Sequence, residues 1–520
     1  MKKSFYKKSV EKVVLQLSPD YKETIRSSSY IGKKGYTIPK SILTIPDLEF
    51  LKKDLFMKPQ TFGFTGNDNS YAFPVYRENE KKFYIPRFYG IQRYGLPDIS
   101  ELVSGTDIDI RFTKELRDYQ ENIVNIYLKH VSSGSNGGIL EVPCGRGKTV
   151  MALKIIAELK KKTLILVHKE FLMNQWIERI SEFLPSARVG KIQCSKFEVE
   201  GNDIVIGMIQ TMYSREFPAA AFSCFGLTII DEVHHIGSEE FSKTLLKTVT
   251  PYMLGISATV ERKDGLTRIL YMFIGNKIYS EERTADDPVC VRGIVFHSPD
   301  PEYNETIVDW KGDTQYSSMI TKVCNFGPRS DFIIRILKDL ILENPENQIM
   351  VLAHNRSLLT YLYEAINHHQ IATTGYYVGG MKEVKLKETE SKKIVLATYA
   401  MAAEALDIKS LSTLVMVTSK TDIEQSVGRI LREKHKNPIV VDIVDKHETF
   451  MNQWTKRKTF YRKCNYRILT NDSTKYTGFA DINSWKVVFE PKNKTSCLEE
   501  EPDTNMPTKC LLKFPSGFQK

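Results

Sequence analysis

The sequence predicts two successive α/β domains, each built on a parallel sheet flanked by helices, preceded by an N-terminal accessory domain. Short apolar runs bounded by turn residues alternate with segments of helical period, which is the pattern of buried parallel strands joined by crossover helices. A first set of runs predicts strands at 137–142, 163–168, 203–208, 227–231 and 252–257. A second set predicts strands at 348–353, 393–399, 413–419 and 438–445. Two sets of buried strands imply two sheets and therefore two domains.

Changes in composition along the chain predict its division into regions. We expect an N-terminal accessory domain over 1–105, α/β domains over 106–285 and 286–465, and a partly mobile C-terminal extension over 466–520. The stretch 281–330 is rich in Asp, Glu, Pro and Ser and is the expected hinge. After about residue 490 the chain becomes rich in Pro, Lys and Glu, which is typical of a mobile tail.

Composition and charge indicate a soluble intracellular protein. The 520 residues include 73 Lys and Arg against 63 Asp and Glu, and the net charge of +10 favours a polyanionic partner, although an ordinary basic protein fits as well. The eight cysteines have no zinc-type spacing and suit a reducing compartment better than a disulfide framework. A signal peptide is not predicted, nor is an apolar run of about 18 residues, so we expect no membrane association.

The N-terminal region interleaves aromatic and basic residues, most densely in KKFYIPRFYGIQRYGLP (81–97). Such a pattern could stack nucleobases and contact phosphates. Tyrosine and phenylalanine are, however, more often part of a hydrophobic core. The sequence leaves both interpretations open.

A glycine-containing loop, PCGRGKT (143–149), connects the strand at 137–142 to a helical pattern over 150–160. Glycines at this junction let backbone N–H groups turn toward an anion, the lysine reaches the β- and γ-phosphates, and the threonine can ligate magnesium. Val142 stands where the usual pattern has its first glycine. The predicted nucleotide-binding residues of this loop are Pro143, Cys144, Gly145, Arg146, Gly147, Lys148 and Thr149.

Two carboxylates end the strand at 227–231, in the segment DEVHH (231–235). Beside a phosphate loop, Asp231 is placed to hold magnesium and Glu232 to accept a proton from the attacking water. The alternative is an acidic turn that caps the next helix, which suits the histidines better than the carboxylates. We expect His234 to couple the two domains rather than to ligate a metal.

Three further motifs follow in order: GISATVERKDG (255–265), TYAMAAEALDI (398–408) and QSVGRILR (425–432). Together with the phosphate loop and DEVHH, they make residues 110–460 resemble superfamily 2 helicases of the DExH class. The resemblance is to the XPB-like branch, and within it to the poxvirus transcript-release helicase and its relatives in large DNA viruses. It implies two tandem RecA-like domains that clamp ATP and Mg²⁺ between them.

The resemblance also implies roles for residues that spacing alone does not assign. Gln120 in LRDYQ (116–120) matches the glutamine that recognises adenine, with Phe112 as a stacking neighbour. Ser257 and Thr259 match the motif that couples hydrolysis to movement. Glu404 and Asp407 match a second coupling motif and are predicted to bind the nucleotide, although Ala405 replaces the usual glycine of this motif. Lys263 departs from the Arg-Glu-Asp motif of the XPB-like branch at residues 262–264.

The final motif supplies Gln425, Arg429 and Arg432, whose arginines would reach the γ-phosphate across the cleft. Two arginines one helical turn apart form a fork suited to phosphate oxygens. An exposed basic helix is the alternative, but it does not account for a second α/β domain. A composite site does, because the domains would close only on ATP.

The resemblance to this family also implies which residues hold the nucleic-acid backbone: Lys169, Gln210, Thr211, Asn355, Arg356 and Thr398. Phosphate contacts carry no sequence information, so we expect binding to DNA, RNA or both to be largely sequence-independent and sensitive to salt.

The leading hypothesis is an ATP-dependent 3′-to-5′ helicase or translocase in viral transcription, elongation or transcript release. It implies RNA polymerase or transcription factors as partners, and the host cytoplasm or the virion as its location. One alternative is a motor subunit of a restriction or repair system, although no carboxylate cluster with nuclease spacing is found in the sequence. Another is a polymerase-binding scaffold, which would not need the complete nucleotide-binding constellation.

Overall fold

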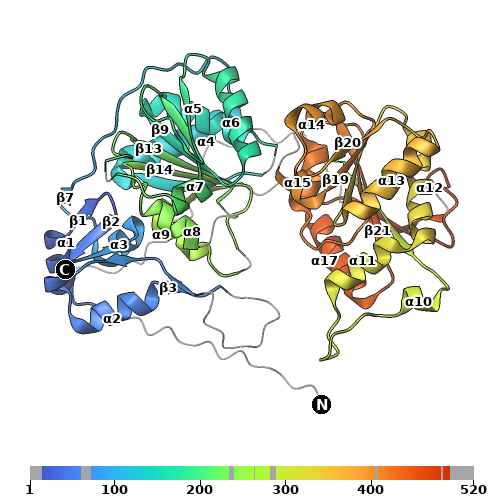
Figure 1. Ribbon diagram of the computed structural model, residues 1–520, viewed down its shortest axis with the longest axis horizontal. Coiled ribbons are helices and arrows are strands. Elements are labelled where there is room, and N and C mark those ends of the chain that lie inside the picture. The colour runs from blue at the N-terminus through green and yellow to red at the C-terminus, as the bar shows by residue number, and fades with distance from the viewer. Residues whose placement is uncertain are drawn as a thin grey trace, which may run out of the picture.

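The predicted fold class is confirmed: the chain is an α/β protein with two parallel-dominated sheets in tandem RecA-like domains and a smaller N-terminal sheet. The computed structural model describes residues 15–59, 72–143, 145–218, 220–233, 239–262, 264–281, 288–404, 408–481 and 484–491. Figure 1 shows the N-terminal domain against the first α/β domain, on the side away from the second. Within the described ranges, none of the helices combines the length and apolarity needed to traverse a bilayer.

The first α/β domain contains an eight-stranded sheet in which all described pairs are parallel except β10–β11. Across the sheet lie β11 (Lys196–Phe197), β10 (Val189–Gln193), β12 (Ile204–Met208), β9 (Thr163–Val167), β13 (Leu227–Asp231), β14 (Tyr252–Ser257), β8 (Gly137–Glu141) and β15 (Lys277–Ser280). One face carries α4 (Asp118–His130), α5 (Lys148–Leu159) and α6 (Glu170–Phe183); the other carries α7 (Ile209–Ser214), α8 (Glu239–Leu245) and α9 (Thr267–Ile274) (Figure 1). The central strands are continuous apolar runs because helices bury both of their faces.

The second α/β domain repeats this plan with another eight-stranded sheet, parallel except for the edge pair β22–β23. Across it lie β18 (Thr374–Tyr377), β19 (Ile394–Thr398), β17 (Gln348–Ala353), β20 (Leu411–Met416), β21 (Ile439–Asp445), β16 (Cys290–Phe296), β22 (Arg467–Asp472) and β23 (Lys486–Phe489). One face packs on α10 (Pro301–Asn304), α11 (Tyr316–Asn325), α12 (Gly327–Glu343) and α13 (Arg356–His368). The other packs on α14 (Glu383–Glu390), α15 (Tyr399–Glu404), α16 (Glu424–Gly428) and most of α17 (Glu448–Lys463).

The expected hinge over 281–330 is wrong for most of its length. This stretch contains β16, which pairs in parallel with β21 and β22 inside the second sheet, and it also contains α11. Described polar residues that follow β16, such as Ser298, Asp300 and Glu302, made this strand hard to recognise in the sequence. The expected C-terminal extension over 466–520 begins with β22 and β23, which extend this second sheet. The domain boundaries themselves stay a prediction.

In the residues that the structure describes, the N-terminal domain combines α-helices with a small mixed sheet. The sheet contains β5 (Arg77–Glu78), β6 (Lys82–Ile85), β2 (Gly35–Pro39), β1 (Tyr30–Gly32) and β7 (Ile99–Ser100), and a separate ribbon contains β3 (Phe56–Met57) and β4 (Phe73–Pro74). The helices are α1 (Pro19–Ser28), α2 (Ile45–Asp54) and α3 (Arg87–Tyr94). Phe83, Tyr89 and Tyr94 are buried, so these aromatic residues of 81–97 belong to the core rather than to a base-stacking surface.

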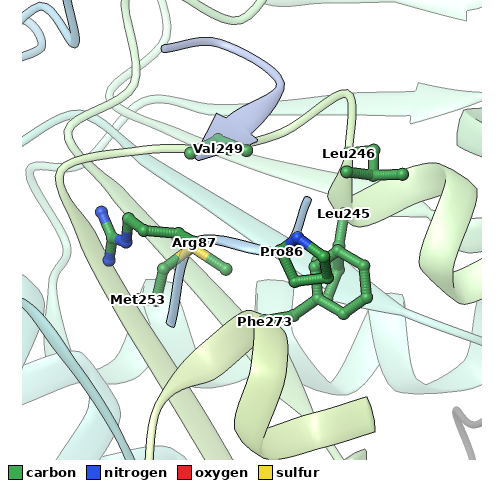
Figure 2. A pocket seen from close by; sticks show the side chains of 8 residues that line it. Pro86, Arg87, Leu245, Leu246, Val249, Met253 and Phe273 are labelled. Carbon is green, nitrogen blue, oxygen red and sulfur yellow. The ribbon is translucent and has the colours of Figure 1, made fainter. Parts of the chain in front are cut away.

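Arg87 joins the N-terminal domain to the first α/β domain. Its buried guanidinium donates to the carbonyls of Thr250, Pro251 and Asn136 at 2.9, 3.0 and 3.1 Å. Figure 2 shows Arg87 beside a small pocket at this junction, whose labelled lining is Pro86, Arg87, Leu245, Leu246, Val249, Met253 and Phe273. The N-terminal domain is therefore packed firmly on the body that carries the phosphate loop.

Candidate functional site

The phosphate loop turns sharply between β8 and α5. Gly145 and Gly147 adopt φ of +83° and +80°, the left-handed region that favours glycine. A Cβ atom at Gly147 would also come within 2.4 Å of the Gln120 Nε2 atom, so a side chain at this position would clash with Gln120. Pro143 is buried at the start of the loop, and Cys144 lies outside the described residues. The loop thus brings backbone groups around the N-terminus of α5, where an anion is favoured.

Lys148, the first residue of α5, donates a hydrogen bond from Nζ to Glu232 Oε1 at 2.9 Å. Glu232 follows β13 directly and has φ of +50°, which a residue with a side chain rarely adopts. Such backbone strain is found preferentially at functional sites. Thr149 lies half-buried one residue after Lys148, in the first turn of the helix.

Asp231 is buried at the C-terminal end of β13. Its Oδ2 atom accepts a 2.8 Å hydrogen bond from the indole N–H of Trp176, and its Oδ1 atom accepts from the backbone N–H of Glu232 at 2.9 Å. Burial raises the pKa of Asp231 to about 6, and the negative charge of Glu232 acts in the same direction, against the opposing charge of Lys148. Trp176, on α6, orients the Asp231 carboxylate through this hydrogen bond. It was not predicted from the sequence, because no local sequence pattern marks it.

Gln120 is buried beside the phosphate loop. Its Oε1 atom accepts from the backbone N–H of Arg117 at 3.0 Å, and its Nε2 atom donates to the carbonyl of Arg146 at 3.0 Å. The Arg146 guanidinium lies 4.0 Å from the centre of the Tyr119 ring and pairs with Glu281. This contact between Tyr119 and Arg146, beside Gln120, was not predicted from the sequence.

Phe112, predicted as a neighbour of the base, stacks on Phe183, with ring centres 5.5 Å apart. The ammonium group of Lys154 lies 5.6 Å from the centre of the Phe112 ring. In this structure Phe112 therefore belongs to the packing between α5 and α6.

The final motif of the second domain lies against the phosphate loop. A Cβ atom at Gly145 would be 3.8 Å from Arg432 Cα and 3.8 Å from the carbonyl oxygen of Leu431. Arg429 begins a 3₁₀ turn after α16 and is buried, while Gln425 is half-buried on α16. The structure thus brings the backbone at Arg432 next to the loop that precedes Lys148.

The two domains also touch through α6 and α14. Lys387 Nζ lies 2.7 Å from Glu178 Oε1, and Asn174 Nδ2 donates to Glu383 Oε2 at 3.3 Å. Figure 1 shows these helices facing each other across the gap between the domains. Both contacts are exposed, so they are worth little free energy and can open readily.

The predicted coupling residues are only partly described. Ser257 is buried at the end of β14, and its hydroxyl donates to the carbonyl of Thr259 at 2.6 Å. His234 and Asp407 lie outside the described residues. Glu404 is the last residue of α15. The structure therefore shows a fixed turn after β14 but does not bring all the coupling residues together.

The predicted nucleic-acid residues of the first domain differ in accessibility. Lys169 is exposed before α6. Gln210 is exposed and donates to the carbonyl of His168 at 2.8 Å. Thr211 is buried, and its hydroxyl accepts from the backbone N–H of Cys194 at 3.0 Å. Lys169 and Gln210 are thus presented to solvent, whereas Thr211 supports the turn behind them.

In the second domain the predicted residues follow the ends of two neighbouring strands. Asn355 precedes α13, and its Nδ2 atom donates to Thr321 Oγ1 at 3.5 Å. Arg356 is exposed and donates to the carbonyl of Gly379. Thr398 ends β19, which pairs in parallel with β17. Because parallel strands end at one edge of a sheet, Asn355, Arg356 and Thr398 lie on the same edge.

Comparison with known proteins relates the chain to ATP-dependent motors. Residues 113–262 match the family model described as type III restriction enzyme, res subunit. A protein of Acanthamoeba polyphaga mimivirus, named as an ATP-dependent RNA helicase, is 34% identical over 84% of this chain and 86% of its own length. An African swine fever virus protein named in the same way is 26% identical over 76% of this chain and 81% of its own. The Sulfurisphaera tokodaii protein named DNA 3′-5′ translocase XPB2 is 27% identical over 64% of this chain and 82% of its own.

Proposed function

Since the chain belongs to the superfamily 2 helicases, in the XPB-like group found in large DNA viruses, we propose that it translocates on DNA in the 3′-to-5′ direction and acts in viral transcription. As a member of this family the chain is an ATP-dependent helicase or translocase. The proposed substrate and polarity draw on the name of the XPB2 relative, a DNA 3′-5′ translocase. The names of the viral relatives refer to RNA, so the test compares both nucleic acids.

The observation that carries the proposal is the approach of the two α/β domains at the phosphate loop. The backbone at Arg432 lies next to Gly145, and Lys148 follows three residues later, beside Glu232. A site divided between two bodies can close on ATP and open after hydrolysis, which converts chemistry into relative movement.

The residues divide the chemistry of hydrolysis among themselves. Lys148 would leave its pair with Glu232 and bind the β- and γ-phosphates. Glu232, freed of the lysine, would accept the proton of the attacking water. Arg429 and Arg432 would stabilise charge on the transferred phosphoryl group. Gln120, beside the contact between Tyr119 and Arg146, would recognise the adenine.

Magnesium fits the donor set at this site. Thr149 offers a hydroxyl and Asp231 a buried carboxylate, and hard oxygen ligands of this kind suit Mg²⁺. When bound, the ion would neutralise phosphate charge. Trp176 would keep the Asp231 carboxylate oriented through its indole N–H.

Three exposed side chains and the half-buried Asn355 support sequence-independent contact of both domains with one strand. Lys169 and Arg356 carry positive charge, and Gln210 and Asn355 offer amide groups for phosphate oxygens. Each phosphate neutralised releases counterions, so affinity should fall steeply with salt concentration.

The direct test is ATP hydrolysis by the whole chain, with single-stranded DNA, duplex DNA and RNA added separately across a range of salt. We expect stimulation by DNA, and displacement of a strand from a duplex with a 3′ overhang but not a 5′ overhang. Lys148→Ala is the matched inactive control. Equal rates of hydrolysis with and without nucleic acid, at every salt concentration, would rule out the translocase.

A restriction or repair motor is the second candidate, because the matching family model is described as the res subunit of a type III restriction enzyme. Incubation of the chain with supercoiled plasmid DNA and ATP distinguishes the two. Linear or nicked product would favour the nuclease motor, whereas intact plasmid with stimulated hydrolysis favours the translocase.

A role in transcription requires a link to the transcription machinery, and we propose RNA polymerase or a transcription factor as the partner. The N-terminal domain is firmly fixed to the first α/β domain through Arg87, so it could transmit movement to such a partner. Release of nascent RNA from stalled elongation complexes in the presence of ATP tests this role. Release by the Lys148→Ala variant at the wild-type rate would exclude it.

A further inference from the structure

Residues 307–315 form a rigid hairpin between α10 and α11, here named the tip hairpin. Val308 and Thr314 make an antiparallel bridge, and the backbone N–H of Asp309 donates to the carbonyl of Asp313 at 2.8 Å. The Asp309 carboxylate accepts in return from the backbone N–H of Asp313 at 2.9 Å. The tip is therefore held by its own hydrogen bonds and is shaped before any ligand arrives.

Trp310 occupies the end of the tip hairpin and is 88% exposed. The other three tryptophans of the chain, Trp176, Trp454 and Trp485, are buried. The ammonium group of Lys311 lies 4.7 Å from the centre of the Trp310 ring. A large aromatic side chain held out in water adds nothing to the core, so its role is at the surface.

The tip hairpin rises from the edge of the sheet where the predicted nucleic-acid residues lie. The parallel strands β16, β17 and β19 end together at Phe296, Ala353 and Thr398. The helix that follows the hairpin, α11, carries Thr321, which accepts the hydrogen bond from Asn355. Figure 1 shows the hairpin as the yellow-green loop that projects from the lower side of the second domain. The tip hairpin is thus joined through α11 to the edge of the sheet on which Asn355 lies.

The charges of the tip hairpin favour a base over a phosphate. Lys311 is its one cation, and it is outnumbered by the acidic Asp309 and Asp313. Acidic groups repel the phosphate backbone, whereas stacking of a neutral base on an indole ring is unaffected. The ring is therefore suited to an unpaired base or to the last base pair of a duplex.

We propose that Trp310 stacks on a nucleobase at the point where a duplex opens, so that the tip hairpin is the wedge that separates the strands. This inference rests on the proposed function, because translocation would supply the force that drives the duplex against the wedge. The shared ligand chemistry is the base, and separate DNA and RNA forks distinguish its source.

Fluorescence tests the contact directly, since Trp310 is the one exposed tryptophan. Saturating a wild-type sample with a forked DNA or RNA duplex should quench the exposed emission and protect it from iodide. The matched Trp310→Phe protein supplies the emission of the three buried tryptophans. The difference between the wild-type and Trp310→Phe spectra reports Trp310 alone. If this difference spectrum does not change when the fork is fully bound, as measured with a labelled fork, the proposal is overturned.

Strand displacement tests the function of the wedge as base pairs separated per ATP hydrolysed. Loss of one stacking contact predicts a fall of about tenfold for Trp310→Ala, whereas Trp310→Phe should stay within about twofold of wild type. Leu342→Ala, at a 78% exposed position on α12, is the control for removing a surface hydrophobic group.

The outcomes separate this inference from the proposed function. If nucleic acid does not stimulate hydrolysis by the wild-type chain, the proposed function fails. If hydrolysis is stimulated but Trp310→Ala separates as many base pairs per ATP as wild type, only the wedge is wrong. Loss of a protein partner by Trp310→Ala, with strand displacement intact, would assign the ring to a protein contact and overturn the wedge.

Discussion

The ammonium group of Lys148 lies 2.9 Å from a carboxylate oxygen of Glu232, so the lysine proposed to bind phosphate and the proposed general base are paired with each other. A triphosphate that enters the loop must compete with Glu232 for the lysine. Binding would therefore free the carboxylate at the moment when a water needs activation. The binding role of Lys148 and the catalytic role of Glu232 should therefore be distinguishable by mutation.

Glu232→Gln should abolish turnover and preserve nucleotide binding. The amide keeps an oxygen that can accept from Lys148 but cannot take a proton, so kcat should fall by about 10²- to 10⁴-fold. Steady-state hydrolysis and the affinity for a fluorescent ATP analogue measure the two effects. Glu239→Gln, which removes an exposed carboxylate paired with Lys243, is the control and should retain wild-type turnover. Loss of nucleotide affinity in Glu232→Gln would show that the carboxylate has a binding role instead.

Magnesium-dependent nucleotide binding should rise as pH increases through about 6. Burial, and secondarily the charge of Glu232, raises the pKa of Asp231 to about 6, so the proton competes with the metal below that pH. Removing the Trp176 hydrogen bond, which favours the charged form, should raise the pKa further and move the curve to higher pH.

The measurement is the affinity for ADP with Mg²⁺ between pH 5 and pH 8 in wild type and Trp176→Phe. At about pH 6 the variant should bind roughly tenfold more weakly, as expected for a lost hydrogen bond to a charged group. At pH 8 the two affinities should converge, because the carboxylate is then ionised in both proteins. Parallel curves with a constant offset would indicate a general packing defect.

Arg432→Ala should slow the nucleic-acid-stimulated hydrolysis of ATP. The affinity for the nucleotide should stay largely intact. Its backbone lies against Gly145, so closure can bring the side chain to the γ-phosphate. An arginine that stabilises phosphoryl charge is worth about 10³- to 10⁵-fold in rate. Lys434→Ala, two residues later and exposed, is the control for loss of positive charge. A loss of less than tenfold would remove Arg432 from the chemistry.

The strands that the sequence predicted correctly share one physical property. β13 and β17, for example, are buried along their whole length, and burial on both faces produces continuous apolar runs. The strands that were missed are partly exposed or flanked by polar turns. β10 alternates buried and half-buried residues over five positions, and β16 lies between polar segments that suggested a hinge.

The candidate site also contains parts that the sequence predicts and contacts that it does not. The phosphate loop and Asp231–Glu232 are continuous segments whose chemistry can be read from neighbouring residues. The Trp176–Asp231 hydrogen bond joins residues 55 positions apart, and the approach of Arg432 to Gly145 depends on how the two domains pack. Contacts of this kind leave no periodic or local pattern, so they require the tertiary structure.

Arg87→Met should weaken the junction between the N-terminal and first α/β domains. Methionine fills a similar volume but leaves the carbonyls of Thr250 and Pro251 without their buried donor, at a cost of about 2 to 4 kcal/mol. For a unit of this size the thermal midpoint should fall by about 5 to 10 °C in differential scanning calorimetry. Lys22→Met, at an exposed position of α1, should leave the midpoint unchanged. If Arg87→Met melts with the control and resists protease equally well at the domain junction, the two domains are held together by apolar packing rather than by the arginine.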